Sequence, residues 1–252
     1  MLREKGKQIV FVTNNSTKAR SQYITKLAAL GIPATINEIF GSAYSAAVYI
    51  SRVLKLPKDK KVYVIGEAGI ESELASEGIQ YFGGSDPAEN GPVSTQDIDD
   101  FKPDPEVGVV LVGLDRGINY RKLAKAYQYL QHPDTLFLAT NVDSTFPTNG
   151  KLFPGAGSCS APLAYMTGRT PLSLGKPSQA MMDAIEGKFQ FDRKRTCMVG
   201  DRLNTDIAFG IEGKLGGTLG VLSGVMKEED ILKEGVEVVP EVYLDTLCDL
   251  LG

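Results

Sequence analysis

Two aspartates five residues apart, Asp201 and Asp206, are the residues of this sequence best suited to chemistry. They follow a short apolar run, residues 197–199, which is typical of the end of a buried strand, and Gly200 permits a sharp turn after it. Open α/β sheets bind their ligands beyond the carboxyl ends of the strands. Two carboxylates at such a place, with no His or Cys between them, favour a hard cation such as Mg²⁺. The alternative is a helix-capping Asp beside a surface Asp.

Groups that suit an anion follow two other predicted strands. Residues 9–12 form an apolar run typical of a buried strand, which ends in Thr13, Asn14 and Asn15. These hydroxyl and amide donors precede a helical pattern, so they form either an anion cradle or a capping turn. Lys176 stands between another strand end and a helix start, where a solvated lysine is also ordinary. Taken alone, neither signal decides between a binding role and a structural one.

The three strand ends together indicate one kind of ligand. They supply hydroxyl and amide donors, a fixed cation and a pair of carboxylates. Donors and a lysine balance the charge of phosphoryl oxygens, and Mg²⁺ neutralises the remainder. We therefore expect Thr13, Lys176 and Asp201 to converge on a phosphoryl group and a divalent ion.

The bulk composition is that of an ordinary globular protein. The 252 residues are 42% hydrophobic and 23% charged, which suits one large domain or two smaller ones. The net charge of −4, with no basic block, disfavours nucleic acid as a partner. No apolar run approaches the roughly 18 residues that span a bilayer. Residues 1–8 lack the apolar core of a secretory signal, so we expect neither membrane insertion nor secretion.

Cysteine and histidine usage argues against several mechanisms. Cys159, Cys197 and Cys248 are scattered, with no C-x-x-C motif, and we expect them to be reduced thiols of an intracellular protein. The only histidine, His132, precedes Pro133 in a turn-like stretch, which favours a loop residue over a catalyst. Mechanisms of the Ser-His-Asp or Cys-His kind are therefore discounted.

Strand and helix patterns alternate along the chain, which predicts parallel sheets. The polar, Pro-containing residues 56–60 are a candidate domain boundary. The expected strands are residues 9–12, 36–40, 61–66, 107–112, 135–139, 171–174, 197–199 and 218–222, and residues 236–239 belong to the tail before the last helix. One expected helix is capped by Ser16 or Thr17 and ends near residue 30, and two others cover residues 42–54 and 120–130. Two more end at residues 78 and 166, and the last two include residues 181–185 and 244–250. Residues 83–105 are expected to be a long loop, and residues 144–150 a turn.

Two glycine motifs approach nucleotide-binding loops without matching them. Gly155-Ala-Gly157 begins like a dinucleotide fingerprint but lacks the third glycine, and residues 151–154 before it are turn-like. A turn into a helix is the simpler explanation. The stretch around Lys176 is not a Walker loop, because Pro177 interrupts it and no glycine stands at the required distance before it.

The order of T-N-N, G-K-P and G-D-x-x-x-x-D strand ends resembles the haloacid dehalogenase superfamily of phosphohydrolases. Within that superfamily the chain is most similar to the p-nitrophenyl phosphatase and phosphoglycolate phosphatase group. The resemblance runs through essentially the whole chain, in the segments VTNNSTKAR, IFGSAY, KVYVIGEAGI, GLDRGINYRKL, TNVDSTFP, PGAGS, LGKPS, MVGDRLNTDI and VLSGV.

The resemblance implies an α/β fold, with a three-layer, doubly wound, mostly parallel sheet core and an inserted α/β cap. The core would comprise residues 1–55 and 171–252, and the cap residues 56–170. The resemblance further implies a cytoplasmic, Mg²⁺-dependent enzyme that acts on a small phosphorylated metabolite. It also implies homodimers formed through the cap.

The same resemblance implies roles for individual residues. Thr13, Asn14 and Asn15 match the phosphate-binding segment, and Lys176 matches the lysine that steadies the phosphate and the nucleophile. Asp201 matches the magnesium ligand, and Asp206 the acid that holds a metal-bound water. The cap loop at residues 141–147 is a candidate for substrate choice, with Asn141 and Asp143 expected to contact the substrate.

The family's nucleophile is not found at its expected place. The reaction uses an aspartate that attacks phosphorus and a second aspartate two positions later, on a strand well before T-N-N. Only twelve residues precede Thr13, and none is Asp. The one internal D-x-D, Asp97 and Asp99, lies in the predicted cap with no apolar strand before it. We interpret Met1 as an internal methionine of a longer protein, and expect two strand edges of the core sheet to lack their partner.

Three interpretations stay open. The first is a magnesium-dependent phosphomonoester hydrolase by family, represented by a chain without its nucleophile. The second is a non-catalytic, phosphate- or metal-binding pseudophosphatase whose cap mediates dimerisation. The third and weakest is a dinucleotide-binding protein that uses Gly155 and Gly157. The sequence identifies no particular substrate.

We predict that the 252-residue chain alone does not hydrolyse p-nitrophenyl phosphate in the presence of Mg²⁺, because the attacking aspartate is missing. We also expect the chain to be poorly stable. A colorimetric assay of the purified chain measures the turnover. Hydrolysis that disappears in an Asp201→Ala variant would contradict this prediction.

Overall fold

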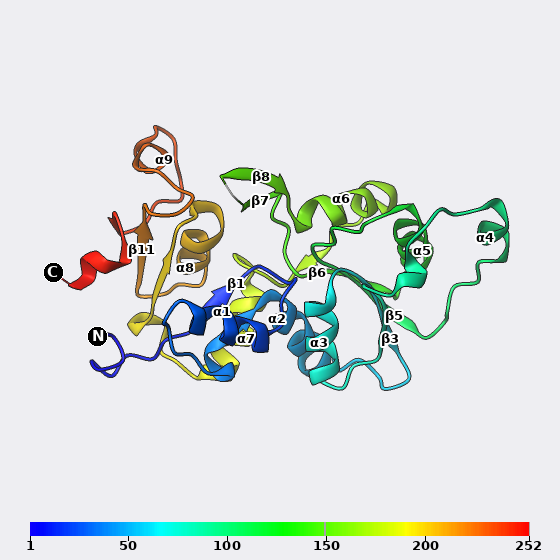
Figure 1. The fold of residues 1–252 in the computed structure, drawn as a ribbon, viewed down its shortest axis with the longest axis horizontal. Helices are drawn as coiled ribbons and strands as arrows, with labels where there is room; N and C mark the ends of the chain where they lie inside the picture. Colours follow the sequence, from blue (N-terminus) through cyan, green and yellow to red (C-terminus); the bar gives the residue numbers. More distant parts are fainter. Residues whose placement is uncertain (149, 252) are drawn as a thin grey trace. The chain divides into compact units, whose positions relative to one another are not determined.

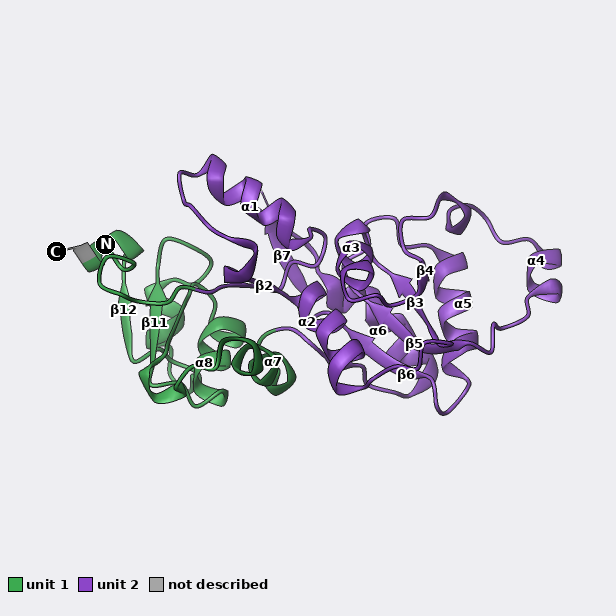
Figure 2. Ribbon diagram, turned by 90° about the horizontal axis from the view of Figure 1, so that it is seen from below, with its two compact units in different colours: residues 1–9, 176–252 green, residues 10–175 purple. Residues whose placement is uncertain are grey.

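Parallel strands connected by helices build both compact units of the computed structural model, which describes residues 1–148 and 150–251. The larger unit comprises Val10–Gly175, and the smaller one combines Met1–Ile9 with Lys176–Gly252 (Figure 2). The expected α/β class with parallel sheets is confirmed. The division into core and cap stays a prediction, since residues 10–55 fall into the same unit as the expected cap. None of the helices in the described part of the chain could cross a membrane.

The larger unit is organised around a five-stranded parallel sheet in the order β4-β3-β5-β6-β9 (Figure 1). The strands are β3 (Lys61–Ile65), β4 (Tyr81–Gly83), β5 (Val107–Val112), β6 (Leu136–Ala139) and β9 (Leu172–Ser173). The helices of this part are α3 (Ala68–Ser76), α4 (Thr95–Asp100), α5 (Tyr120–Leu130) and α6 (Ala156–Thr167). Helices lie on both sides of the sheet, which is the usual cover of a parallel sheet.

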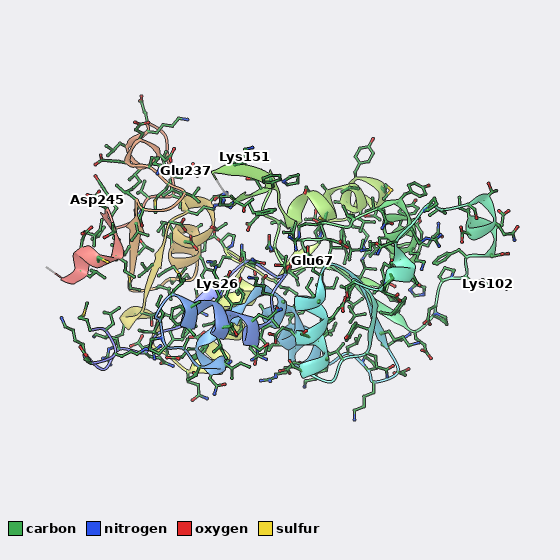
Figure 3. The ribbon with its side chains drawn as sticks, viewed as in Figure 1. Lys26, Glu67, Lys102, Lys151, Glu237 and Asp245 are labelled. Carbon is green, nitrogen blue, oxygen red and sulfur yellow. The ribbon has the colours of Figure 1, made fainter. Side chains whose placement is uncertain are left out.

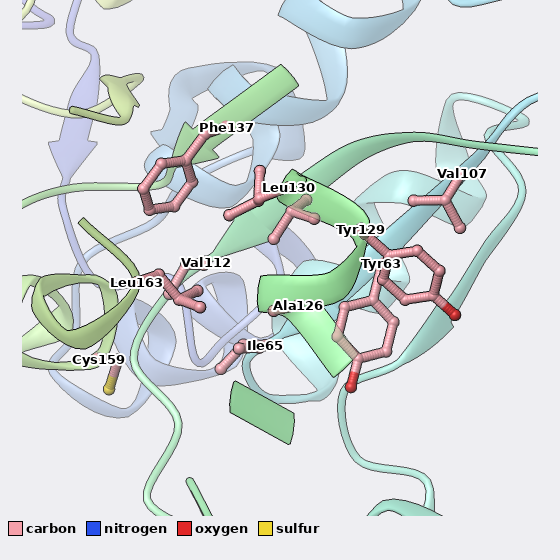
Figure 4. Packing of buried hydrophobic residues seen from close by; sticks show 11 residues of the cluster. Tyr63, Ile65, Val107, Val112, Ala126, Tyr129, Leu130, Phe137, Cys159 and Leu163 are labelled. Atoms are coloured by element: carbon pink, nitrogen blue, oxygen red, sulfur yellow. The ribbon is translucent and has the colours of Figure 1, made fainter. Parts of the chain in front are cut away.

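Side chains from both faces of this sheet are removed from water. In β5, Val110 and Val112 point to one face and Val109 and Leu111 to the other, and all four are fully buried. One face packs against α5 and α6 in a single apolar cluster (Figure 4). The buried members of that cluster are Tyr63, Ile65, Val107, Val110, Val112, Ala126, Tyr129, Leu130, Phe137, Cys159 and Leu163. The continuous Val and Leu run of β5 is therefore explained by burial on two sides.

The larger unit also contains a short parallel pair that carries the T-N-N sequence. β1 (Phe11–Thr13) pairs with β2 (Ile39–Gly41), and Thr13 lies opposite Gly41. The adjoining helices are α1 (Arg20–Ala29) and α2 (Ser42–Val48), the latter continued by a π-helical turn at Tyr49–Val53. Arg20 fixes α1, because its Nε donates to Glu73 Oε2 of α3 at 2.9 Å and its guanidinium stacks 3.3 Å from the centroid of the Tyr44 ring.

The smaller unit has its own three-stranded parallel sheet in the order β10-β11-β12. Its strands are β10 (Cys197–Gly200), β11 (Gly217–Val221) and β12 (Val242–Leu244). Its helices are α7 (Gln179–Phe189), α8 (Ala208–Glu212) and α9 (Glu228–Leu232). The 3₁₀ turns of the described residues are η1 (Ile36–Glu38), η3 (Pro87–Glu89), η4 (Arg193–Arg195) and η6 (Leu247–Leu251). Among the described residues β1 pairs only with β2 and β10 only with β11, and whether a further strand joins them stays a prediction.

An antiparallel hairpin replaces the turn that was expected at residues 144–150, of which Asn149 lies outside the described residues. β7 (Thr145–Thr148) pairs with β8 (Lys151–Pro154), a stretch that was expected to be turn-like. Phe146 and Phe153 face each other across the hairpin with ring centroids 6.1 Å apart, which stabilises the pairing. Pro147 and Pro154 argue against a strand in the sequence, but a two-stranded hairpin tolerates proline where no backbone N–H is needed for pairing.

The other wrong expectations concern segment ends. α1 begins at Arg20 after Ala19, so neither Ser16 nor Thr17 caps it. The expected loop 83–105 contains α4. The strand β12, which begins after Pro240, was not among the expected strands. A 3₁₀ turn stands where a helix was expected at 244–250.

We predict that Leu163→Ala lowers the free energy of unfolding of the larger unit by about 2–5 kcal/mol, because it opens a cavity in the cluster between sheet and helices. Tyr165 lies on the same helix with 91% of its surface exposed, so Tyr165→Ala is the matched control and should change stability by less than about 0.5 kcal/mol. Urea unfolding measures both effects. Equal effects of the two changes would show that this cluster is not the core.

Candidate active site

A buried ion pair stands at the carboxyl end of β10. The Nζ of Lys176 donates to Asp206 Oδ1 at 2.6 Å, and the two side chains are only 9% and 8% exposed. The backbone N–H groups of Asp201 and Arg202 donate to Asp206 Oδ2 at 3.2 and 3.1 Å. Asp206 therefore accepts three hydrogen bonds, which suits a group that positions its neighbours. Burying two charges adds little net stability, so a functional reason for this pair is worth seeking.

The local chain path brings Asp206 back over the end of its own strand. Leu203–Ile207 form a π-helical turn before α8, and such turns are frequent at functional sites. The backbone N–H of Asp206 donates to Arg202 O at 3.0 Å within this turn. Any side chain at position 200 would overlap the Asp206 carboxylate. Gly200 is therefore required by this close approach.

Asp201 is held by the loop after β11, which contains the VLSGV sequence and to which the sequence alone assigned no role. The N–H of Val225 donates to Asp201 Oδ2 at 2.9 Å, and the N–H of Met226 donates to Asp201 O at 2.8 Å. A side chain at Gly224 would overlap that of Asp201. The loop follows β11, which pairs with β10 so that Gly200 lies opposite Gly220. In the sequence this loop is visible only as a Ser-Gly pair after a predicted strand. That it contacts Asp201 becomes known only from the order of the strands, which places β11 next to β10.

The donor set of the smaller unit fits a hard cation. Only Oδ2 of Asp201 accepts a hydrogen bond among the described residues, which leaves Oδ1 to a ligand. No cluster of three or more His, Cys, Asp or Glu side chains occurs in residues 1–148 and 150–251. Mg²⁺ commonly binds through one or two carboxylates and keeps several waters, whereas Zn²⁺ requires three or four protein ligands. The residues present thus suit a partly hydrated Mg²⁺.

In the larger unit the structure brings together three predicted site residues that lie far apart in the sequence. The side-chain amide of Asn14 donates to both oxygens of Asp143, at 3.3 and 3.2 Å. The amide of Asn141 donates to Asn14 O at 2.7 Å, and Ser42 Oγ donates to the same oxygen at 2.7 Å. The N–H of Asp143 donates to Asn141 Oδ1 at 3.1 Å. The end of β1 is thereby fixed to the segment after β6.

Thr13 and Asn15 are engaged in local contacts. Thr13 Oγ1 lies 3.4 Å from the Tyr23 hydroxyl and accepts the N–H of Asn15 at 3.2 Å. Burial raises the pKa of Tyr23, partly offset by the contact with Thr13, so the phenol is neutral at physiological pH. Asn15 Oδ1 accepts both the N–H and the hydroxyl of Thr17, at 2.9 and 2.8 Å. These bonds form an Asx turn, which shapes the T-N-N segment.

A pocket of about 410 Å³ opens beside this network, entirely within the larger unit. Its lining combines the residues after β1, the residues after β5, and the start of the hairpin and of α6. The lining residues are Asn14, Asn15, Ser16, Thr17, Lys18, Leu114, Arg116, Asn141, Asp143, Phe146, Pro147, Gly155 and Ala156. Four of the predicted substrate-binding residues therefore share one cavity, whereas Thr13 does not line it.

Packing accounts for both glycines of the Gly155-Ala-Gly157 motif. A side chain at either position would overlap the backbone of residues 142–143. The N–H of Gly157 donates to Asp143 O at 2.9 Å, and the N–H of Gly155 donates to Ser144 O at 2.8 Å. The motif thus serves a close approach between two backbone segments, and no dinucleotide is needed to explain it.

The internal D-x-D sequence lies on the short helix α4. Asp97 accepts the N–H and hydroxyl of Ser94 at 2.8 and 2.7 Å, which forms a capping box, and Arg121 contacts it as well. These bonds, those of Ser94 first, lower the pKa of Asp97 to about 2. An acid committed to a helix cap in this way is a poor candidate for a nucleophile.

The smaller unit thus carries a lysine–aspartate pair and an aspartate with an open carboxylate oxygen, and the larger unit carries amide donors, each after a parallel strand of an α/β fold. A family model described as haloacid dehalogenase-like hydrolase matches residues 1–80, and a second HAD-hydrolase-like model matches residues 173–250. The chain belongs to this family of haloacid dehalogenase-like hydrolases, and by family it is a phosphatase.

Individual relatives are similar over nearly the whole chain. The 4-nitrophenylphosphatase of Schizosaccharomyces pombe is 53% identical over 250 residues, which cover 99% of this chain and 84% of that protein. Phosphoglycolate phosphatase 2 of Arabidopsis thaliana is 43% identical over 254 residues, 100% and 83% of the two chains. Among solved structures, p-nitrophenyl phosphatase from Archaeoglobus fulgidus matches with a TM-score of 0.82 at 30% identity and covers 99% of this chain and 87% of that one.

We predict that Gly224→Ala destabilises the smaller unit by about 1–3 kcal/mol, because the added methyl group displaces Asp201 or the loop that holds it. Gly187→Ala is the control: it lies in α7 with open space around its Cα, and should be neutral or stabilising by up to about 1 kcal/mol. Thermal unfolding of both variants tests the claim. A neutral Gly224→Ala variant would show that the loop does not enclose Asp201.

Proposed function

We propose that this chain carries the phosphate- and metal-binding groups of an enzyme for the magnesium-dependent hydrolysis of small phosphomonoesters, of the kind exemplified by 4-nitrophenyl phosphate and 2-phosphoglycolate, with no attacking aspartate assigned among its 252 residues. The observation that carries the proposal is the buried Lys176–Asp206 pair beside Asp201, which keeps one carboxylate oxygen for a ligand. The names of the relatives support the choice of ester.

The proposal gives the side chains distinct tasks. Asp201 would hold Mg²⁺, which when bound neutralises charge on the phosphoryl oxygens. Lys176 would place a second, fixed positive charge on the phosphoryl group, and Asp206 would hold that lysine in position through their 2.6 Å bond. Asn14 and Asn15 would donate amide hydrogens to the phosphoryl oxygens, with Thr13 shaping their turn.

The nucleophile is assigned by resemblance to an aspartate of a D-x-D sequence, which forms an aspartyl-phosphate that water then hydrolyses. We do not assign that role to Asp97 or Asp99, because Asp97 caps α4. A chain that binds phosphate and metal without turnover would be a pseudophosphatase, the second interpretation.

Location and assembly belong to the same proposal. We place the protein in the cytoplasm, since all three cysteines are free thiols. Homodimers formed through the cap are proposed from the resemblance alone.

We predict that Mg²⁺ raises the affinity of the chain for inorganic phosphate, and that Asp201→Asn abolishes this gain. Lys176→Met should weaken phosphate binding at least about tenfold, which corresponds to about 1.4 kcal/mol. Titration calorimetry with and without EDTA measures both effects, and circular dichroism checks that the variants are folded.

The control is Asp245→Asn, which removes a charge from an exposed position of the same unit (Figure 3). It should bind phosphate and Mg²⁺ as the unaltered chain does. Phosphate binding that ignores Mg²⁺ and the state of Asp201 would end the proposal of a magnesium-dependent site.

A further inference from the structure

One cation on the wall of the pocket has no part in the proposed chemistry. Arg116 follows β5 and lines the pocket together with Asn14 and Phe146. Its Nε and one terminal nitrogen donate to the two carboxylate oxygens of Glu67 at 2.6 and 2.8 Å. This two-bond geometry is the one with which arginine binds a planar carboxylate. The contact with Glu67 thus shows that the guanidinium is placed to bind a carboxylate.

The backbone that carries Arg116 is fixed on both sides. Asp115 and Lys122 form an ion pair at 2.7 Å with side chains only 3% exposed, and Asp115 also accepts the N–H of Gly117 at 2.8 Å. A side chain at Gly113 would overlap Ile70. The loop is therefore anchored by buried contacts, so that Arg116 is presented to the pocket from a preorganised backbone.

The pair of Arg116 with Glu67 is weak enough to be exchanged. The Arg116 side chain is 72% exposed and that of Glu67 is 21% exposed (Glu67 is labelled in Figure 3). Exposed ion pairs contribute little net stability, so exchange of Glu67 for a ligand carboxylate on the same guanidinium costs little. A ligand that is held in the pocket through its phosphoryl group then competes with Glu67 for Arg116.

We propose that Arg116 is a specificity-determining residue, which selects phosphomonoesters whose leaving group carries a carboxylate. The inference rests on the proposed phosphatase function. It places the phosphoryl group toward Asn14 and the ester's carboxylate at Arg116, in a pocket whose lining also includes Leu114 and Phe146. Glu67 acts as a competing anion that occupies the guanidinium when no such ester is bound.

The test compares two esters that differ in one group. 2-Phosphoglycolate carries a carboxylate where 2-hydroxyethyl phosphate carries a hydroxymethyl group. Their dissociation constants are measured by calorimetry with the 252-residue chain, so that the result does not depend on turnover. Arg116→Met should weaken 2-phosphoglycolate about tenfold and 2-hydroxyethyl phosphate less than about twofold. Glu67→Gln should tighten 2-phosphoglycolate about threefold, and should do nothing in the Arg116→Met background.

Two matched variants serve as controls. Arg52 forms the same kind of two-bond pair, with Glu77, on the same unit but away from the pocket lining, so Arg52→Met should change neither affinity. Lys18 is the other cation of the lining, and Lys18→Met should weaken both esters alike.

Three outcomes would overturn the inference. Arg116→Met could affect both esters equally, or neither, while the unaltered chain binds both. Lys18→Met could instead produce the selective loss. If the unaltered chain binds neither ester nor inorganic phosphate, the proposed function fails and the inference falls with it.

Discussion

The hydrogen-bonded burial of Asp206 is the constraint around which the smaller unit is arranged. A carboxylate that is almost fully removed from water must be matched by donors, and here a lysine and two backbone N–H groups supply them. Each donor imposes a condition on the chain: a strand that ends at Gly200, a π-helical turn, and a lysine just before α7. Asp201 is oriented by its own N–H, which donates to Asp206, and by the loop at Gly224, from which Val225 donates to its carboxylate.

In the larger unit, it is a neutral side chain that donates hydrogen bonds to a carboxylate, that of Asp143. Asn14 satisfies Asp143, and two further donors satisfy the carbonyl oxygen of Asn14, so the pocket wall is tied together by bonds between distant segments. Hydrogen-bonded networks between partly buried side chains help to specify one arrangement of the segments that they join. The two glycines at 155 and 157 then allow α6 to begin against the same segment.

Strong local patterns were sufficient to predict the elements of the fold, and they could not predict what those elements touch. The apolar run of β5 and the amphipathic run of α5 are bounded in the structure as expected, at Val107–Val112 and Tyr120–Leu130. The contact of Asn14 with Asp143 joins residues 129 positions apart, and that of Arg116 with Glu67 joins residues 49 apart. Side-chain partners at such separations depend on strand order, which no local pattern encodes.

Under the proposed function, the bond between Asn14 and Asp143 also stands in competition with ligand binding. An anion that takes the Asn14 amide competes with a carboxylate located directly before β7. Binding and the release of that carboxylate are then two sides of one equilibrium, and linkage is reciprocal. Under the proposed function, a change that weakens the contact of Asp143 with Asn14 would therefore raise the affinity for the anion, and a bound anion would weaken that contact in turn.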